Sequence, residues 1–340
     1  ERQHRISGWN ALFRAASDWL PIFICFCYFG GSEMWKDWIR PYVRPLPQWS
    51  TVAVAPPQQA VTATLRWDGK SEDVTTDHTV ASLVPLVIAT SLDAGQHPVL
   101  EYRDSATERL LGILRLVKTA SIATEKTSLT LYHVAAGEHR CLGWPLRPWN
   151  AWLQNRLMLK NRSPHHFAPE PVAVQQLMIA YLCPRPVVLV SVDTPDHRNI
   201  FPMDLIGPLE RSGFFSLALR STNVSLPVMR ETRRVALSGM PATMKEMVYK
   251  LAEHHRQPLK DWTALPFPVR PSQTFEIPVV TAALRIQELA IEHSHEIGSH
   301  VFFLCRVVSE ENLAQSDQLH HTAGFHQAYR RGQGTPFAEM

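Results

Sequence analysis

The chain alternates between short apolar runs and polar turns, a pattern typical of a β-rich fold. Several runs are rich in β-branched residues or alternate in polarity, as half-buried strands do. These runs predict strands at TVAVA (51–55), VTATLRW (61–67), SLTLYHV (128–134), VVLVSVD (187–193), FFSLALR (214–220) and RRVALSG (233–239). Two longer runs, 278–296 and 300–308, predict a pair of long strands joined by a compact turn, Ile297-Gly298-Ser299.

Two segments have helical spacing instead. Ser105 and Glu108 form an S-x-x-E capping box, and leucines follow at 110, 111, 114 and 116, which predicts a helix that begins at Ser105. The segment 242–255, ATMKEMVYKLAEHH, places Met244, Met247, Val248 and Leu251 on one stripe and predicts a second helix.

The domain organisation follows from a connector rich in proline and tryptophan at 141–172, with a boundary near Pro164. We expect an α+β or mainly β chain in three parts. Residues 1–165 form an N-terminal mixed α+β region of unknown kinship, 166–312 form a small Greek-key barrel, and 313–340 form a polar C-terminal tail. No internal repeat is visible in the sequence.

Composition and charge exclude some classes of protein. With 45% hydrophobic residues among 340, the chain is not disordered. Its 34 basic and 31 acidic residues give a net charge of +3, too balanced for a nucleic-acid-binding protein. No P-loop, G-x-G-x-x-G, G-x-S-x-G or H-E-x-x-H motif is present.

Cysteine and histidine usage indicates neither a disulfide framework nor a metal site. Five cysteines favour a reducing compartment, which we take to be the cytoplasm. We interpret Cys25 and Cys27 as buried, inert thiols, and His165-His166 as part of a loop. The apolar run Trp19–Phe29 has eleven residues, too few for a membrane span, and predicts a buried strand or interface segment. A membrane-surface anchor is the alternative.

The candidate chemistry lies in polar loops at strand ends in the second half. The loop 197–208 contains Asn199, Met203 and Asp204, and the turn 297–299 precedes His300. The segment that follows the strand 214–220 places a cation beside clustered hydroxyl groups: Arg220, Ser221, Thr222 and Ser225. Such a loop can hold a phosphate or a polar ring. It can equally cap a helix at 226–232, and the residues alone leave both interpretations open.

Residues from about 170 to 310 resemble the flavin reductase-like domain, the FMN-binding split barrel. The resemblance rests on four segments in order: PRPVVLVSVD, the N-x-x-P of Asn199 to Pro202, the run 214–238, and IGSHVFFLCRVV. Two features depart from the family pattern. Ser299 stands where the closing motif usually has Asp, and about 165 residues precede the barrel.

The resemblance implies a C2 homodimer with FMN, or FAD, in a groove near the subunit interface. Carried over, the flavin-binding positions are Asn199, Met203, Asp204, Arg220, Ser221, Thr222 and Ser225. His300 would lie where the nicotinamide of NADH or NADPH meets the flavin, as the catalytic residue. No metal site is expected.

The expected function is therefore an NAD(P)H-dependent flavin oxidoreductase, with supply of reduced flavin to a partner monooxygenase as one role. A second possibility is an FMN-dependent oxidoreductase that acts directly on a small organic substrate. A third, from another class, is a flavin- or haem-binding protein without turnover.

Overall fold

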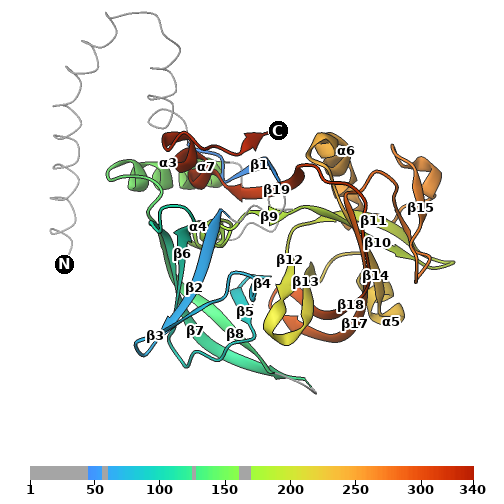
Figure 1. The fold of residues 1–340 in the computed structure, drawn as a ribbon, viewed down its shortest axis with the longest axis horizontal. Coiled ribbons are helices and arrows are strands. Elements are labelled where there is room, and N and C mark those ends of the chain that lie inside the picture. The colour runs from blue at the N-terminus through green and yellow to red at the C-terminus, as the bar shows by residue number, and fades with distance from the viewer. Residues whose placement is uncertain (1–44, 56–59, 125–127, 161–169) are drawn as a thin grey trace, which may run out of the picture. The chain divides into compact units, whose positions relative to one another are not determined.

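The structure is a computed structural model, and it describes residues 45–55, 60–124, 128–160 and 170–340. These residues form one compact unit (Figure 1). The expectations for Trp19–Phe29, Cys25, Cys27 and the loop with His165-His166 lie outside the described residues, as does the boundary near Pro164. The described chain is mainly β, as the sequence predicts. Within the described ranges, no helix combines the length and the apolar character needed to cross a membrane.

The N-terminal part forms a seven-stranded antiparallel sheet, here called the first sheet. Its order is β3-β2-β6-β7-β8-β5-β4. The strands are β2 (Val61–Trp67), β3 (Lys70–Asp73), β4 (His78–Leu83), β5 (Leu86–Thr90), β6 (Val99–Asp104), β7 (Leu110–Ala123) and β8 (Ser128–His139).

The helix predicted to begin at Ser105 is wrong, because the leucines that follow lie on β7. Asp104, not Ser105, organises the segment: its carboxylate accepts hydrogen bonds from the backbone N–H groups of Ala106 and Thr107, at 3.0 and 2.9 Å. These bonds shape the turn between β6 and β7, and the Ser105 hydroxyl has no partner. An Asx turn and a capped helix start share residue types, so the motif alone did not separate them.

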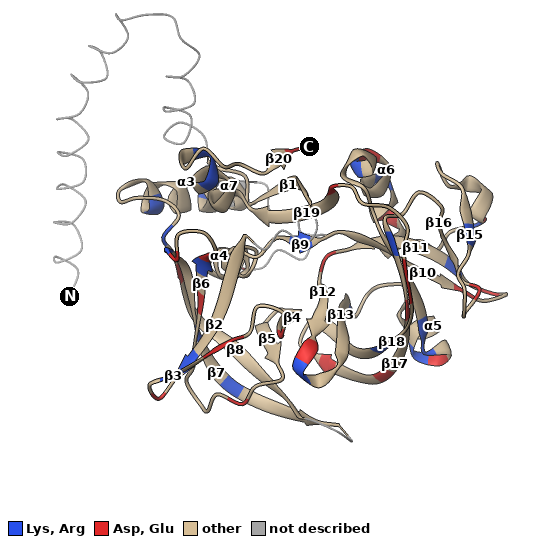
Figure 2. Ribbon diagram, in the orientation of Figure 1, with Lys and Arg blue, Asp and Glu red and all other residues tan. Residues whose placement is uncertain are grey.

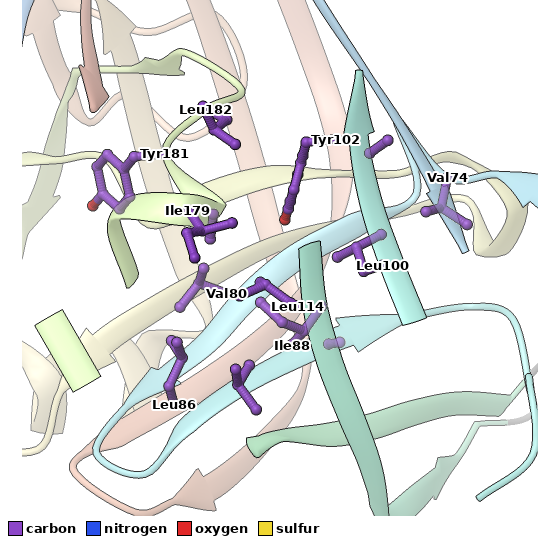
Figure 3. Packing of buried hydrophobic residues seen from close by; sticks show 14 of the residues in the cluster. Val74, Val80, Leu86, Ile88, Leu100, Tyr102, Leu114, Ile179, Tyr181 and Leu182 are labelled. Atoms are coloured by element: carbon purple, nitrogen blue, oxygen red, sulfur yellow. The ribbon is translucent and has the colours of Figure 1, made fainter. Parts of the chain in front are cut away.

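Two helices follow the first sheet, α3 (Leu146–Lys160) and α4 (Pro171–Ala180). α4 approaches β7 and β8 closely because both strands have glycine at the contact. A Cβ at Gly112 would lie 2.5 Å from the Leu182 side chain, and one at Gly137 would lie 2.9 Å from that of Ile179. Figure 3 shows Ile179 and Leu182 among the buried side chains of this core, with Val80 and Leu114.

The C-terminal part forms a second seven-stranded antiparallel sheet, here called the second sheet. Its order is β11-β10-β14-β17-β18-β13-β12. The strands are β10 (Val188–Asp193), β11 (Arg198–Met203), β12 (Ile206–Leu209), β13 (Phe214–Arg220), β14 (Arg234–Gly239), β17 (Arg285–Ile297) and β18 (His300–Asn312). Four of the predicted strands, 187–193, 214–220, 233–239 and 300–308, are recovered here, because their apolar residues fill the interior of this sheet.

Several short elements are inserted between these strands. They are η1 (Glu210–Ser212), α5 (Leu226–Thr232), η2 (Ala242–Met244), α6 (Lys245–Lys250), η3 (Leu251–His255), η4 (Trp262–Ala264), β15 (Val269–Pro271) and β16 (Pro278–Val280). The helix predicted at 242–255 is confirmed as three consecutive helical pieces. The single strand predicted over 278–296 is wrong, since a turn at 281–284 separates β16 from β17.

A third, small sheet joins distant parts of the chain in the order β20-β1-β19-β9. Its strands are β1 (Trp49–Val54), β9 (Arg185–Pro186), β19 (Gln318–Ala323) and β20 (Ala338–Glu339), with α7 (Gly324–Gly332) between the last two. The residues after 312, expected to be a polar tail, are thus built into the fold. Leu319, Ala323 and Phe325 are buried there, which explains why this segment is ordered despite its polar composition.

The two large sheets have the same topology. Replacing β2 to β8 in turn by β10, β11, β12, β13, β14, β17 and β18 converts the order of the first sheet into that of the second. In each sheet the two longest strands form a bulged hairpin, β7–β8 and β17–β18. We call residues 61–139 the first repeat and 188–312 the second repeat. The expectation of no internal repeat is therefore wrong at the level of topology, which sequence inspection does not detect when side chains have diverged.

The repeats pack against each other through buried apolar side chains. Leu205, Leu209, Ala218, Phe302 and Leu304 of the second repeat belong to the same apolar cluster as the interior of the first sheet. The main core thus runs across the boundary between the repeats. Charged residues of both signs are interspersed over both repeats (Figure 2).

Candidate functional site

The loop after β13 is the first part of the candidate site. Arg220, Ser221 and Thr222 are exposed, whereas Asn223 and Ser225 are buried. The Asn223 side chain accepts a hydrogen bond from the backbone N–H of Ser225 at 2.8 Å. The loop therefore presents one cation and two hydroxyl groups on a backbone that its own buried residues hold in shape.

Asn199 and Ser225 lie next to each other and are joined by a hydrogen bond. The Asn199 amide, fully buried on β11, donates to the Ser225 hydroxyl at 2.7 Å and to the carbonyl of His254 at 2.8 Å. Its carbonyl oxygen accepts from the backbone N–H of Ile200. These bonds occupy the Asn199 side chain, so its position in this structure is that of a support for the loop.

Two histidines of η3 complete that support. The Asn223 amide donates to Nδ1 of His255 at 2.8 Å, and Nε2 of the same ring donates to the carbonyl of Pro202 at 2.9 Å. Burial lowers the pKa of His255, which agrees with a neutral ring that accepts on one nitrogen and donates on the other. From the sequence these residues were predicted only as the end of a helix. The His254-His255 pair was the one feature that could have indicated their role in supporting the loop.

His300 lies next to this loop. It is paired with Arg220 across β13 and β18, and the Ser221 backbone N–H donates to the carbonyl of Ser299 at 3.2 Å. Burial, and secondarily the positive charge of Arg220, lowers the pKa of His300 to about 4. The ring is therefore neutral at neutral pH, and its Nδ1 lies 2.8 Å from the hydroxyl of Ser299.

The first repeat covers the turn that precedes His300. The backbone N–H of Ser299 donates to the Val84 carbonyl at 2.8 Å, and the Val84 N–H donates to the Ser299 hydroxyl at 3.2 Å. Gly298 has φ of +55°, and a Cβ there would lie 2.2 Å from the Val84 carbonyl oxygen. Only glycine fits this turn, because the β4–β5 turn of the first repeat lies directly on it.

Met203 and Asp204 make different contacts from the loop residues. Met203 is 7% exposed and packs in the apolar interior of the second sheet. The Asp204 carboxylate accepts from the Tyr181 hydroxyl at 2.9 Å and from Nδ1 of His321 at 2.7 Å. The structure thus brings Asn199, Arg220 to Ser225 and His300 together, while Met203 and Asp204 have other partners.

The Asp204 cluster continues through His321 to the small sheet. Nε2 of His321 lies 2.6 Å from the Tyr249 hydroxyl, which in turn lies 2.9 Å from the Thr51 hydroxyl. Burial raises the pKa of Asp204, but the hydrogen bonds from His321 and Tyr181 outweigh burial and hold that pKa below its usual value. The cluster ties β1, β19 and the residue that follows α4 to Asp204 and α6 of the second repeat. No sequence motif indicated it, because its members are far apart in the chain.

Histidine ligands for a metal ion are not clustered in the part of the chain that the structure describes. No group of three or more His, Cys, Asp or Glu residues there is arranged to hold one.

Comparison with known proteins identifies the C-terminal half. Residues 180–329 match the family model of the flavin reductase-like domain. This match includes β19 and most of α7, beyond residue 312 where the sequence analysis ended the domain. The comparison with curated proteins found no match.

Solved structures of low sequence identity are also similar to part of the chain. An FMN-binding protein from Thermus thermophilus is 22% identical, with 44% of this chain and 80% of that chain covered and a TM-score of 0.37. The NADH:FAD oxidoreductase of Streptomyces globisporus is 16% identical, with 48% and 96% covered and a TM-score of 0.40. The flavin reductase component of a bacterial two-component tryptophan halogenase is 17% identical, with 44% and 93% covered and a TM-score of 0.39.

Proposed function

Because residues 180–329 form a flavin reductase-like domain, we propose that the protein is an NAD(P)H-dependent flavin oxidoreductase whose flavin is FMN or FAD. The observation that carries the proposal is the loop Arg220–Thr222. It is exposed on a support of buried hydrogen bonds, at the place where the sequence analysis expected the flavin. A preorganised loop binds a ligand without the entropic cost of ordering it.

The residues present fit the phosphate of a flavin. Arg220 supplies a positive charge and Thr222 a hydroxyl donor, which phosphate oxygens accept from; the Ser221 hydroxyl donates to the Ser299 carbonyl at 3.4 Å and would turn from it to reach a phosphate. Asn199, Asn223, Ser225 and His255 hold this loop in place. When bound, the flavin supplies the hydride-accepting chemistry, and the protein supplies binding, orientation and electrostatics.

His300 would assist as a neutral hydrogen-bonding group and not as an acid. Its pKa of about 4 leaves it unprotonated at neutral pH, so it has no proton to give through the imidazolium form. We propose that it orients the nicotinamide of NADH or NADPH. Supply of reduced flavin to a partner monooxygenase is the role that we propose for the product, and the C2 homodimer implied by the family resemblance is considered below.

A second candidate is a flavin-binding protein that does not turn over NADH. The observation in its favour is the cover over the His300 turn, where the backbone of Val84 forms two hydrogen bonds with Ser299. If this cover stays in place, a nicotinamide cannot reach His300 from that side.

The absorbance spectrum of the purified protein, followed by addition of NADH or NADPH, tests both candidates. The proposed function predicts flavin bands that bleach on addition of the nucleotide, with steady-state NAD(P)H oxidation when free FMN is supplied. Flavin bands that persist under anaerobic NADH and NADPH would support the binder and contradict the oxidoreductase. Absence of flavin binding at micromolar FMN would contradict both.

A further inference from the structure

The contact between the repeats includes a pair of equivalent strands, as a twofold-symmetric interface does. β4 and β12 occupy equivalent places in the two sheets, and they lie against each other. At this contact a Cβ on Gly207 would lie 3.7 Å from the hydroxyl of Thr79. Contact between equivalent elements is what two copies related by a twofold axis make.

The second sheet has an apolar face that needs a cover, and the first repeat supplies it. Phe302 and Leu304 on β18 are fully buried in the cluster that the repeats share, and Leu205, Leu209 and Ala218 are at most 7% exposed. Polar contacts surround this face, where Val84 meets Ser299 and the Leu83 N–H points at His300 over 3.5 Å. A second chain cannot occupy a face that is already buried.

We propose that the first repeat is a built-in partner: it takes the place of a second subunit, and a single chain is the complete unit. This replaces the C2 homodimer expected from the resemblance. The first repeat also contributes directly to the candidate site, because its β4–β5 turn holds the turn before His300.

An engineered disulfide across the repeats tests this arrangement. The Cβ atoms at Thr79 and Gly207 would be 4.0 Å apart, within the roughly 3.5–4.5 Å of natural disulfides. The double variant Thr79→Cys/Gly207→Cys should form an intrachain link under mild oxidation, detected as a joined peptide by mass spectrometry. Light scattering should give a mass near 38.6 kDa for the wild type and for the oxidised variant. The single variants Thr79→Cys and Gly207→Cys are the controls.

Three outcomes would overturn the proposal. One is a covalent species of twice the mass on a non-reducing gel that forms only in the double variant. Another is a folded double variant that does not form the link. The third is a wild-type mass of about twice 38.6 kDa at micromolar concentration. This measurement is informative even if the double variant does not fold.

A second inference comes from a cavity of about 210 Å³ that lies between the repeats. The first repeat contributes Thr75 and His78 to its wall, and Arg185, Gln287 and Gln318 are among the residues on the other side. The volume is below the roughly 300–1,000 Å³ of sites for drug-sized ligands, so it suits a molecule of a few heavy atoms.

Arg185 gives this cavity its chemistry. The residue is only 6% exposed, and its Nε has no hydrogen-bond partner. In the described ranges no carboxylate forms an ion pair with its guanidinium. The guanidinium carbon lies over the Tyr181 ring, 5.4 Å from the ring centroid. Asp204 lies in the same region but accepts hydrogen bonds from Tyr181 and His321 instead. The charge of Arg185 helps to keep Asp204 ionised, but the guanidinium forms no direct ion pair with it and its Nε stays unpaired, so an anion that contacts the guanidinium directly would stabilise the fold.

We infer that the cavity binds a small anion, a carboxylate or phosphate group, on the guanidinium of Arg185. The amide of Gln318 lies in the wall as a further hydrogen-bond donor. None of the residues that line the cavity belongs to the Arg220 loop, so this site is separate from that loop and can be tested without flavin.

Thermal unfolding without flavin tests the site, with phosphate or succinate exchanged for chloride at constant ionic strength. In the wild type a saturating anion should raise Tm by roughly 2–4 °C, and the arm that does so identifies the anion class. In Arg185→Met, which keeps an apolar side chain, the rise should vanish, and Tm in chloride should equal or exceed that of the wild type. Arg306→Met, a change in an exposed ion pair, is the matched control and should keep the rise.

The inference fails if neither anion raises the Tm of the wild type, or if Arg185→Met keeps the rise. It also fails if Arg185→Met lowers Tm in chloride by several degrees, since that result would show that the arginine stabilises the fold without an anion.

Discussion

The two repeats share a strand order but differ in the connections between their strands. Residues 91–98 join β5 to β6, whereas the equivalent connection, 221–233, carries the Arg220 loop and α5. A tight turn at 105–109 joins β6 to β7, whereas residues 240–284 form the long excursion with α6 and η3. Loops on a rigid scaffold carry function, so the second repeat has the parts of a binding site and the first has the parts of a scaffold.

The charged groups at equivalent strand ends also distinguish the second repeat, as a binding site, from the first. At the end of β5, the hydroxyls of Thr90 and Ser91 donate to the carboxylate of Asp77, at 3.3 and 2.8 Å. At the end of β13, Arg220 and Ser221 are exposed instead. A carboxylate repels a phosphate and a guanidinium attracts one, so we expect one flavin site per chain. Duplication of a fold thus need not duplicate its site.

The largest expected effect concerns the shared core. Phe302 faces the first repeat and Phe303 faces the interior of the second sheet, and both are fully buried. If the repeats form one core, Phe302→Ala and Phe303→Ala should each lower the free energy of unfolding by about 3–5 kcal/mol. Chemical denaturation should show a single transition for both. A loss below 1 kcal/mol for Phe302→Ala alone would mean that the first repeat is a loosely attached domain.

Acid should destabilise both repeats through histidines with lowered pKa values, among them His78 in the first repeat and His300 in the second. Burial lowers the pKa of His78 and of His300 to about 4 from 6.5. Between these values the unfolded chain takes up a proton that the folded chain does not. Stability is therefore complete above pH 6.5 and falls as the pH drops to about 4, by up to roughly 3 kcal/mol for each ring.

Denaturation at several pH values measures this loss. His78→Gln and His300→Gln should each flatten the pH dependence by a similar amount, because glutamine does not titrate. A slope that is unchanged in either variant would show that the corresponding ring is not buried as a neutral group.

Flavin affinity should depend on the second repeat only. Arg220→Ala should weaken FMN binding by about 1.5–3 kcal/mol, the range for a hydrogen bond to a charged group. Arg230→Ala, at an exposed residue paired with Glu296, is the matched control and should bind FMN like the wild type. Fluorescence titration measures both, and equal affinities would remove Arg220 from the site.

The smallest effect that we expect is a loss of flavin reductase activity when His300 is replaced. If it orients the hydride donor, His300→Ala should lower NAD(P)H-dependent flavin reduction ten-fold or more, with little change in FMN affinity. His139→Ala removes a half-buried first-repeat histidine that stacks on Phe325 and whose pKa is also about 4, so it controls for loss of a packed imidazole ring. Wild-type rates in His300→Ala would show that His300 is structural.

Much of the second repeat could be predicted from the sequence because its signals are local. The apolar runs at 187–193, 214–220 and 233–239 became β10, β13 and β14, and the short turn before His300 was recognised from its glycine. Asn199 and Ser225 were both singled out. Their pairing was not, because the two lie 26 positions apart and meet only when β11 packs beside the loop.

The first repeat shows where local signals end. The leucines after Ser105 have spacings that suit either a helix or a strand, and only pairing of β7 with β6 and β8 selects the strand. Its kinship with the second repeat lies in strand order, which depends on contacts between distant segments. A sequence motif reveals such contacts only when the same side chains occupy the contact positions in both repeats.

By itself the sequence determined that this chain is mainly β, since alternation depends on neighbours in the chain, and its loop motifs carry the resemblance of residues 170–310 to the flavin reductase-like domain. Tertiary structure alone decided that the N-terminal half repeats the same topology and covers the apolar face of the second sheet. It also decided that Asp204 joins His321 and Tyr181, and that the buried Arg185 forms no direct ion pair with a carboxylate of the described residues. These features arise from packing between segments that are not neighbours in the chain, such as Asp204 and His321, which lie 117 positions apart. Burial then determines which charges and hydrogen bonds each side chain can have.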